Sequence, residues 1–263
     1  MSIIDEWLAY LTKRNRSPET IRVYSGTIRA FESRVGDLLT CTVDDAEAWW
    51  DTQQHLSVKS RQRYLATVKS FYRWAMRFDH IATDPTRRLD PPTQGRRLPK
   101  PIGRSDMRKA LDNAPDDLRR AIALGAYAGL RVAEAASLSW EDIDLETGRA
   151  IIRGKGDKER AVAIGPALLD ELLPNTGGNV VTAGGHVNSA AQMQRRVNRY
   201  LTSQGIDATF HKLRSRFATV ALGAGVPLLS VSNALGHANP AQTATYALTA
   251  DTDLDLIADA VSR

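Results

Sequence analysis

The sequence has almost no cysteine and no long hydrophobic run. Its single cysteine, Cys41, cannot form a disulfide within the chain, which fits a reducing compartment. No stretch approaches the ~18 uninterrupted apolar residues that a membrane-spanning helix requires. The start of the chain, Met1 to Trp7, lacks the basic segment and apolar core of a signal peptide. We therefore expect a cytoplasmic protein.

Two signatures of cofactor-dependent chemistry are also missing. The sequence has no cluster of carboxylates at metal-binding spacing and no Gly-x-x-x-x-Gly-Lys-Ser/Thr loop to hold nucleotide phosphates. It also lacks internal repeats and low-complexity tracts. These absences argue against a metal-dependent nuclease and an ATP-driven enzyme, and they predict a function that needs no metal or other cofactor.

What the sequence does have is an excess of positive charge. The 263 residues carry a net charge of +5, with 43% hydrophobic and 25% charged residues. This composition is ordinary for a globular protein of one large or two modest domains. A basic excess favours polyanionic partners, but alone it is weak evidence, because many basic proteins bind no nucleic acid.

Helical patterns fill the first third of the chain. In residues 3–15 four apolar side chains share one helical face: Ile4, Trp7, Leu8 and Leu11. Three more helices are predicted over about 17–34, 42–50 and 57–78, because Ser17, Thr42 and Ser57 are typical N-cap residues. Pro18 strengthens the first of these starts, since proline is favoured at the first helical position.

The helix predicted at 57–78 has two distinct faces. At 100° per residue its apolar side chains fill one sector: Tyr64, Leu65, Val68, Phe71, Tyr72 and Ala75. Its cations fill another, with no acid between the first and the last: Lys59, Arg63, Lys69, Arg73 and Arg77. A merely solvated face usually mixes both signs. We therefore predict that these five cations contact DNA phosphates.

Residues 84–101 interrupt the helical pattern. Five prolines remove amide donors and disfavour helix at the residues before them, which predicts an extended linker. The linker is basic and could lie along a phosphate backbone, so Arg96 and Arg97 join the predicted DNA contacts. A simple solvated hinge is an equal alternative.

The remainder is predicted to be mainly helical with a small β segment. Residues 104–139 have helical patterns, whereas 148–152 and 160–164 alternate around a turn at 154–157, which predicts a hairpin. Helices resume from about residue 166, with loops at 175–178 and 184–185. A last short helix is expected at 251–263.

Five features of this region could carry chemistry. They are Gly129-Leu130-Arg131-Val132-Ala133-Glu134, the hairpin tip Gly154-Lys155-Gly156, His211-Lys212-Leu213-Arg214, Leu235-Gly236-His237 and Tyr246. Each alone has an ordinary explanation. Arg131 and Glu134 could form a structural salt bridge, Lys155 could be a solvated turn residue, and Tyr246 could be a packing residue.

Taken together, the order and spacing of these features resemble the tyrosine recombinases of the phage integrase family. The segment Leu138-Ser139-Trp140-Glu141-Asp142-Ile143-Asp144 matches a further motif, and the resemblance covers residues 102–247. One departure is Ser215, where many members carry a second histidine. The implied fold is mainly α with a small antiparallel β-sheet. It comprises a helical core-binding domain at 1–83, a basic proline-rich linker at 84–101 and an α+β catalytic domain at 102–263.

This family architecture closes on DNA as a C-shaped clamp. The chain resembles a short form that lacks the additional amino-terminal domain some phage integrases use for accessory DNA sites.

The resemblance implies six catalytic residues: Arg131, Lys155, His211, Arg214, His237 and Tyr246. The planar fork of an arginine suits two non-bridging phosphate oxygens, which favours Arg131 and Arg214 as a clamp. The two histidines add donors to the same oxygens, and His211 could take the proton of Tyr246. Lys155 could protonate the departing 5′ oxygen. Attack by the tyrosine gives a 3′-phosphotyrosine that retains the bond energy, so rejoining needs no ATP.

The implied partners are double-stranded DNA with paired core sites, further copies of the chain in a tetramer on DNA, and a directionality factor. Phage integration in a bacterial host is the favoured role; Xer-like resolution and mobile-element movement stay open. In the family a carboxy-terminal segment commonly docks on the neighbouring protomer, which we predict for residues 251–263; folding back on the same chain is the alternative.

Two rival functions differ in class. A type IB topoisomerase shares the chemistry, and a non-enzymatic DNA-binding regulator could use the same scaffold. The intact set of six catalytic positions argues against the regulator.

Overall fold

The computed structural model describes residues 1–93, 95, 100–154, 159–173, 177–183, 186–187, 189–237 and 239–247. Several predicted features lie outside these ranges: Arg96, Arg97, Lys155 and the tail 251–263. Contacts group the chain into two compact units, Met1–Arg96 and Arg97–Arg263. None of the described helices has the length and apolar character that crossing a bilayer takes.

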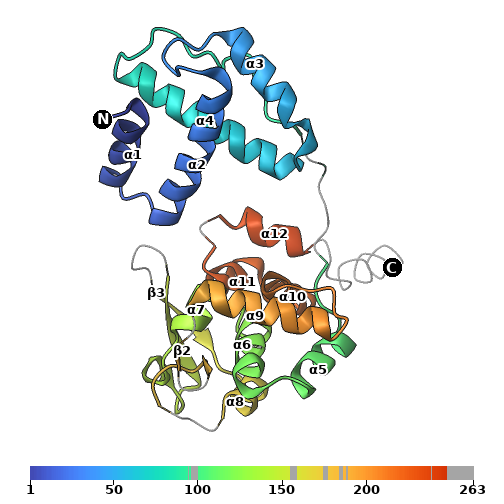
Figure 1. The fold of residues 1–263 in the computed structure, drawn as a ribbon. Coiled ribbons are helices and arrows are strands. Elements are labelled where there is room, and N and C mark those ends of the chain that lie inside the picture. Colours follow the sequence, from blue (N-terminus) through green and yellow to red (C-terminus); the bar gives the residue numbers. More distant parts are fainter. Residues whose placement is uncertain are drawn as a thin grey trace. The chain divides into compact units, whose positions relative to one another are not determined.

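The first unit is a helical bundle (Figure 1). Its elements are α1 (Ile3–Lys13), α2 (Pro18–Val35), α3 (Val43–Thr52), the short 3₁₀ helix η1 (Gln53–His55) and α4 (Val58–Arg77). The predicted caps are confirmed. The side-chain oxygens of Ser17, Thr42 and Ser57 each accept a hydrogen bond from the backbone amide three residues later. A cap of this kind stabilises a helix by about 1 kcal/mol, because it satisfies an amide that the helix itself cannot.

Aromatic residues dominate the core of the first unit. Trp7 of α1 meets Phe71 of α4 edge to face at 5.5 Å between ring centroids, and Phe31 of α2 meets Trp49 of α3 at 4.7 Å. The apolar face predicted for α4 is buried, except that Tyr64 is only half-buried. The start of the predicted linker packs on this unit, since Leu89 is buried in its core.

The second unit combines helices with a small sheet. Its helices are α5 (Arg104–Asp112), α6 (Asp116–Tyr127), α7 (Val132–Ser137), η2 (Trp140–Asp142), α8 (Pro166–Leu172), α9 (Ala190–Ser203), α10 (Phe210–Gly223), α11 (Leu228–Leu235) and α12 (Ala241–Ala247). Helix α6 is central and contacts α5, α7, α8, α9 and α10 (Figure 1). Gly125 allows this packing, because a Cβ there would lie 3.2 Å from Leu213 and Phe210 of α10.

The predicted hairpin is confirmed and gains a third strand. β2 (Arg149–Arg153) lies between β1 (Ile143–Asp144) and β3 (Glu159–Ala163), and both pairings are antiparallel. A second small hairpin, β4 (Thr182–Ala183) with β5 (His186–Val187), was not predicted, because two-residue strands have too few residues for a period-2 pattern. The fold is thus mainly α with a small antiparallel sheet.

Candidate active site

The site is built around the carboxyl end of α11. Gly236 ends this helix in the left-handed conformation, with φ of 63°. The backbone amides of Gly236 and His237 turn back to the carbonyls of Asn233 and Ser232. The next three carbonyls, those of Ala234, Leu235 and Gly236, point beyond the helix and need other donors.

Three arginines satisfy these three consecutive carbonyls. Arg160 Nε donates to the Ala234 oxygen at 2.7 Å, Arg214 Nη2 to the Leu235 oxygen at 2.7 Å, and Arg131 Nη2 to the Gly236 oxygen at 2.8 Å. The carboxyl end of a helix carries partial negative charge, so it favours cations at this position. The helix end therefore aligns three guanidinium groups that come from β3, α10 and the residue preceding α7.

Glu134 is the carboxylate that these arginines share. It is buried at 6% exposure and accepts a bidentate pair from Arg160, at 2.9 and 2.8 Å. Arg131 donates to it from its backbone amide at 2.7 Å and from Nη1 at 2.9 Å. Burial would raise the pKa of Glu134, but the hydrogen bonds and charges of Arg160 and Arg131 outweigh it and lower the pKa to about 2. The group is therefore ionised in its folded state.

Arg214 is held almost completely inside the protein. Its exposure is 3%, and Nη1 donates to the Gly129 carbonyl at 2.6 Å. Burial, followed by the positive charge of Arg131, lowers its pKa to about 10, so it stays a cation at neutral pH. Gly129 has φ of 65°, and a Cβ there would meet Phe217 at 2.6 Å. The glycine of the Gly-Leu-Arg motif is thus required by both conformation and space.

His237 is tied to the helix that carries the tyrosine. Its Nδ1 lies 2.7 Å from Oγ1 of Thr243, a fully buried residue of α12. Burial, followed by the positive charges of Arg214 and Arg131 and the influence of His211, lowers the pKa of His237 to about 4. The imidazole is consequently neutral at pH 7.

Tyr246 lies in α12, one helical turn after Thr243. It is 8% exposed and packs in a small cluster with Ala218, Val231 and Leu235. Its side chain lies close enough to Arg214 to influence the pKa of that arginine, and His211 is close enough to influence His237. The structure thus brings Arg131, His211, Arg214, His237 and Tyr246 into one neighbourhood, whereas Lys155 lies outside the described residues.

Sequence reasoning missed two participants, Arg160 and Thr243. A signal for Arg160 existed in the strand pattern. In β3 the buried Val162 and Arg160 share one face, so a charged residue occupies an inward-facing position and requires a partner. Thr243 offered no comparable signal, since its partner His237 is fixed only by the fold.

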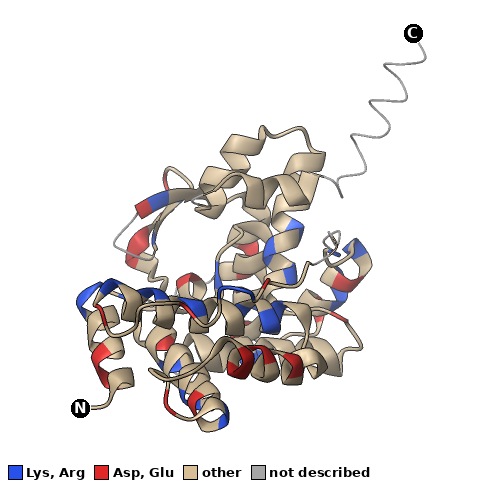
Figure 2. Ribbon diagram, turned by 90° about the horizontal axis from the view of Figure 1, so that it is seen from above, with Lys and Arg blue, Asp and Glu red and all other residues tan. Residues whose placement is uncertain are grey.

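The predicted DNA-contacting cations of the first unit lie along α4. Four of them are exposed and Lys69 is half-buried: Lys59, Arg63, Lys69, Arg73 and Arg77. Within the described part of the chain, no ion pair joins any of them to a carboxylate. Lysine and arginine positions are marked in blue in Figure 2.

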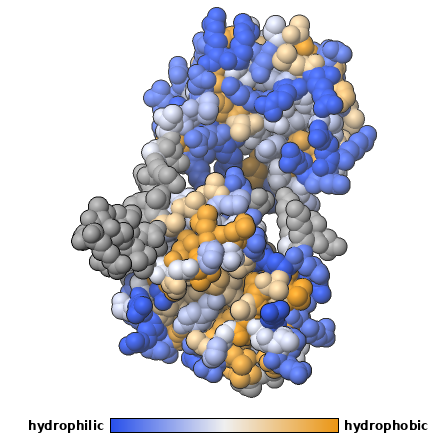
Figure 3. Space-filling view, turned by 180° about the vertical axis from the view of Figure 1, so that it is seen from behind, coloured by the Kyte–Doolittle hydropathy of each residue, from blue (hydrophilic) through white to orange (hydrophobic). Residues whose placement is uncertain are grey.

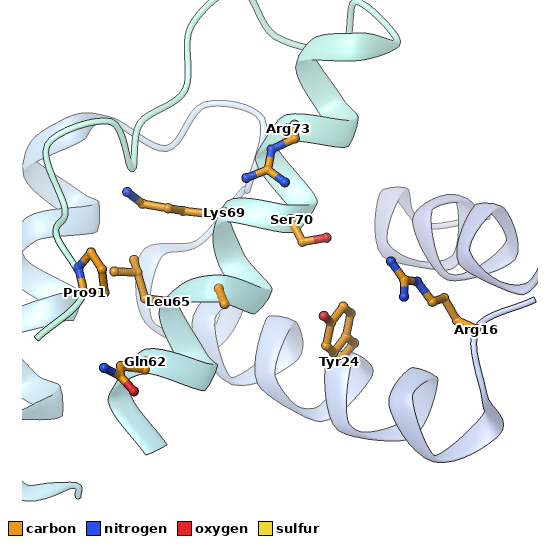
Figure 4. A pocket seen from close by; sticks show the side chains of 9 residues that line it. Arg16, Tyr24, Gln62, Leu65, Lys69, Ser70, Arg73 and Pro91 are labelled. Carbon is orange, nitrogen blue, oxygen red and sulfur yellow. The ribbon is translucent and has the colours of Figure 1, made fainter. Parts of the chain in front are cut away.

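A hollow of about 360 Å³ opens beside this face. Figure 4 shows Arg16 and Tyr24 on one side of it, with Lys69, Ser70 and Arg73 of α4 opposite. The hollow is therefore lined by three cations and a phenol, which suit a polyanion better than an apolar ligand. Among the residues that the structure describes, no three His, Cys, Asp or Glu side chains gather where they could hold a metal ion.

The second unit places a cluster of arginines beside a tyrosine on a helical scaffold with a small sheet, and such a cluster suits an anionic group such as a phosphodiester. The sequence pattern of the phage integrase family matches residues 104–252, and that of its N-terminal SAM-like domain matches residues 4–78. The chain therefore belongs to the phage integrase family, as the sequence motifs predicted.

Individual relatives agree with this assignment. "Tyrosine recombinase XerA" of Thermococcus kodakarensis is 32% identical over 259 residues, covering 93% of this chain and 89% of its own. "Tyrosine recombinase XerC" of Xanthomonas axonopodis pv. citri is 30% identical over 280 residues, covering 94% of this chain and 92% of its own. The chain is a tyrosine site-specific recombinase.

Solved structures share the fold. A lambda integrase dimer bound to a COC′ core site has a TM-score of 0.79 at 19% identity, over 93% of this chain and 76% of that one. The XerH site-specific recombinase bound to palindromic difH substrate has a TM-score of 0.75 at 20% identity, over 95% and 82%.

Proposed function

We propose that this recombinase cleaves and rejoins DNA through Tyr246, with Arg131 and Arg214 holding the scissile phosphate. The observation that carries the assignment is the array of guanidinium groups fixed by the end of α11, beside the helix that bears Tyr246. Donors that are already oriented stabilise developing charge without reorganising, and this is commonly the largest contribution to catalysis.

The reaction balances with residues of this chain. The Tyr246 oxygen attacks phosphorus while its proton passes to His211, and the bond to the 5′ oxygen breaks. Lys155 supplies the proton that the departing oxygen needs. Neutral His237 donates one hydrogen bond to a non-bridging oxygen, and the hydrogen bond to Thr243 orients its ring. Rejoining reverses these steps.

The first unit and the linker supply affinity in this proposal. Lys59, Arg63, Lys69, Arg73 and Arg77 contact phosphates, together with Arg96 and Arg97. In this proposal the chain is divided as the sequence predicts, at 1–83 and 102–263, and both units bind the duplex. Two observations support this proposal: the five predicted cations of α4 form no ion pair with a described carboxylate, and a basic hollow lies beside them.

Assembly on paired sites follows from the same reasoning. Two chains bind each core site and four form the synapse, with residues 251–263 docking on the neighbouring chain. Large apolar side chains are exposed on α10, after it and on α11, namely Val220, Val226 and Leu229. Figure 3 shows hydrophobic surface on the second unit from behind. Such a surface favours a protein partner.

The biological use we propose is integration of phage or other mobile DNA in the cytoplasm of a bacterial host, directed by a further factor. A second candidate is Xer-like resolution, which the relatives named XerA and XerC favour. A plasmid with two directly repeated sites and a pair of plasmids with one site each separate them. Resolution alone supports the second candidate, and efficient joining of separate plasmids supports the first.

The chemistry is tested by covalent trapping. The target sequence is first selected from a random duplex pool with the purified chain. It is then built into a duplex nicked near the scissile bond, so that the cleaved end diffuses away and rejoining fails. We expect a covalent adduct whose DNA is attached to the peptide that contains Tyr246, read by mass spectrometry. Attachment elsewhere refutes the assignment. Relaxation of plasmids without the selected sequence would instead indicate a type IB topoisomerase.

A further inference from the structure

Arg160 is the arginine of the site that the reaction above does not use. It lies at the second position of β3, pairs across the sheet with Ile152 and faces inward beside Val162. Its side chain is only 13% exposed. A buried guanidinium is costly unless its hydrogen bonds are satisfied, so this position calls for a specific role.

All three nitrogens of Arg160 already donate to protein acceptors. Nη1 and Nη2 form the bidentate pair with Glu134, and Nε donates to the Ala234 carbonyl. These bonds direct the fork of Arg160 away from a substrate and toward the groups that hold the substrate-binding arginines. The geometry points to positioning rather than phosphate contact.

The ion pair between Arg160 and Glu134 limits how closely Glu134 pairs with Arg131. Oε1 of Glu134 accepts from Nη1 of both arginines, and Arg214 Nη1 lies 4.0 Å from Oε2. Without Arg160, the buried carboxylate would retain its charge but lose its bidentate partner. It would then draw Arg131 into closer pairing, at the expense of the orientation that a phosphate requires.

Arg160 also supports the turn that leads to His237. A Cβ added at Gly236 would lie 3.2 Å from Cδ and Nη1 of Arg160, so the turn packs directly on this side chain. The carbonyl that accepts from Arg160 precedes those that accept from Arg214 and Arg131. A shift of Arg160 therefore moves the helix end that aligns the other two.

We propose that Arg160 is a positioning residue for DNA cleavage: through Glu134 and the Ala234 carbonyl it holds Arg131 and the turn before His237 in the orientation that a scissile phosphate needs. The inference rests on the proposed function of this site. It assigns to β3 a direct part in the active site, beyond carrying the hairpin with Lys155.

The chain offers a matched control in Arg153. This arginine lies on the neighbouring strand β2 and also forms two ion pairs, with Asp142 at 2.8 Å and Glu159 at 3.3 Å. Its side chain is 63% exposed. Arg153→Gln removes a cation and ion pairs from the same hairpin without touching Glu134.

The test measures single-turnover cleavage of the selected, nicked duplex by full-length variants at saturating protein. We expect Arg160→Gln to slow cleavage about 100-fold, the usual cost of losing one preorganised donor, because Arg131 would no longer be held in orientation. DNA affinity should change less than about twofold. Arg160→Lys keeps the charge but cannot reproduce the fork, so we expect it to stay slow. Arg153→Gln should cleave like the unaltered chain.

A neutral substrate separates positioning from a general loss of structure. A methylphosphonate at the scissile position removes one charged oxygen and lessens the need for the arginine clamp. If Arg160 acts through Arg131, the defects of Arg160→Gln and Arg131→Gln both shrink on this substrate. A purely structural defect would slow both substrates equally, which would overturn the proposal.

A double variant guards against a folding failure. Glu134→Gln with Arg160→Gln removes both members of the bidentate pair together, which proteins tolerate better than loss of one partner. It should show the same substrate selectivity and cleave no more slowly than the slower single variant. If the Arg160 variants cleave as fast as Arg153→Gln, this inference is refuted but the proposed function stands. If the unaltered chain forms no adduct at Tyr246, the proposed function is refuted.

Discussion

The two units use arginine and lysine in opposite ways. On α4 of the first unit the cations are exposed or half-buried and lack carboxylate partners within the described residues. In the second unit Arg214 is buried and Arg160 is largely buried, and their donors are bound to carbonyls and to Glu134. The first arrangement leaves cations free to follow a phosphate backbone; the second fixes them in advance.

This difference separates affinity from chemistry. Exposed cations move, exchange partners and are individually worth little, but together they release counterions from DNA. Buried cations are costly to place, and they are useful where charge develops at one point in the transition state. Substitutions in the first unit should therefore change binding and its salt dependence, and those in the second should change cleavage at constant binding.

Tyr246→Phe should give the largest effect, a complete loss of covalent adduct. The ring keeps its packing with Val231 and Leu235, so the fold and DNA binding should be retained while the nucleophile is gone. Trapping on the nicked duplex and gel shifts measure the two properties. Tyr200→Phe is the control, because it removes another hydroxyl of the same unit, one that donates to the Ala110 carbonyl. An adduct formed by Tyr246→Phe would refute Tyr246 as the nucleophile.

Lys155→Ala should slow cleavage by about 10²- to 10⁴-fold, the usual contribution of a general acid. A substrate with sulfur in place of the 5′-bridging oxygen should restore most of the rate, since a thiolate leaves without protonation. Tyr246→Phe should show no such rescue. Equal defects on the oxygen and sulfur substrates would make Lys155 a phosphate-binding residue instead.

Deleting residues 251–263 tests whether assembly depends on the tail rather than on the cations of either unit. We expect binding to a single half-site to stay nearly intact, because neither the α4 cations nor the α11 array is altered. Cooperative binding to a full site and recombination should be lost, since each chain no longer docks on its neighbour. Native gels on half-sites and full sites measure this. Unchanged cooperativity would place the tail on its own chain.

The first unit was the more predictable of the two from sequence. Its helices begin at local signals, such as Ser17 and Ser57, and its two faces follow from periodicity alone. Trp74 was missed as a core residue because it lies beside the apolar sector rather than within it. Local rules apply here because the helix starts and the two faces of α4 depend on residues that are close in sequence.

In the second unit, the residues within sequence motifs could be predicted, whereas contacts between residues far apart in the sequence could not. The sequence motifs named Arg131, Arg214 and His237, and the structure brings them together. The partnership of Arg160 with Glu134 joins residues 26 positions apart, and the one with Ala234 joins residues 74 apart. No local pattern encodes such pairs, because they depend on how β3 packs against α11.

Replacing Lys69, Arg73 and Arg77 with Ala should weaken binding across sequences and flatten its salt dependence. The slope of log affinity against log salt should fall by roughly 0.9 for each lost phosphate contact. Cleavage of bound DNA at saturating protein should be unchanged. Arg22→Ala is the control, because Glu19 already neutralises that exposed cation at 2.6 Å. An unchanged slope in the triple variant would make the α4 face merely solvated.

The smallest expected effect is a pH dependence of stability that belongs to the second unit. The pKa of His237 is lowered from 6.5 to about 4, chiefly by burial. Between these values the unfolded chain binds a proton that the folded chain does not, so stability should fall as pH drops from about 7 to 4, by at most about 1.4 kcal/mol per pH unit. Glu134, whose pKa is about 2, stays ionised in the folded state over this range. Calorimetry of His237→Asn should show a shallower fall than the unaltered chain, and His80→Asn in the first unit serves as the control. Equal slopes of stability against pH in all three proteins would mean that His237 is not held neutral by its surroundings. The comparison between the two units would then depend only on their arginines and lysines.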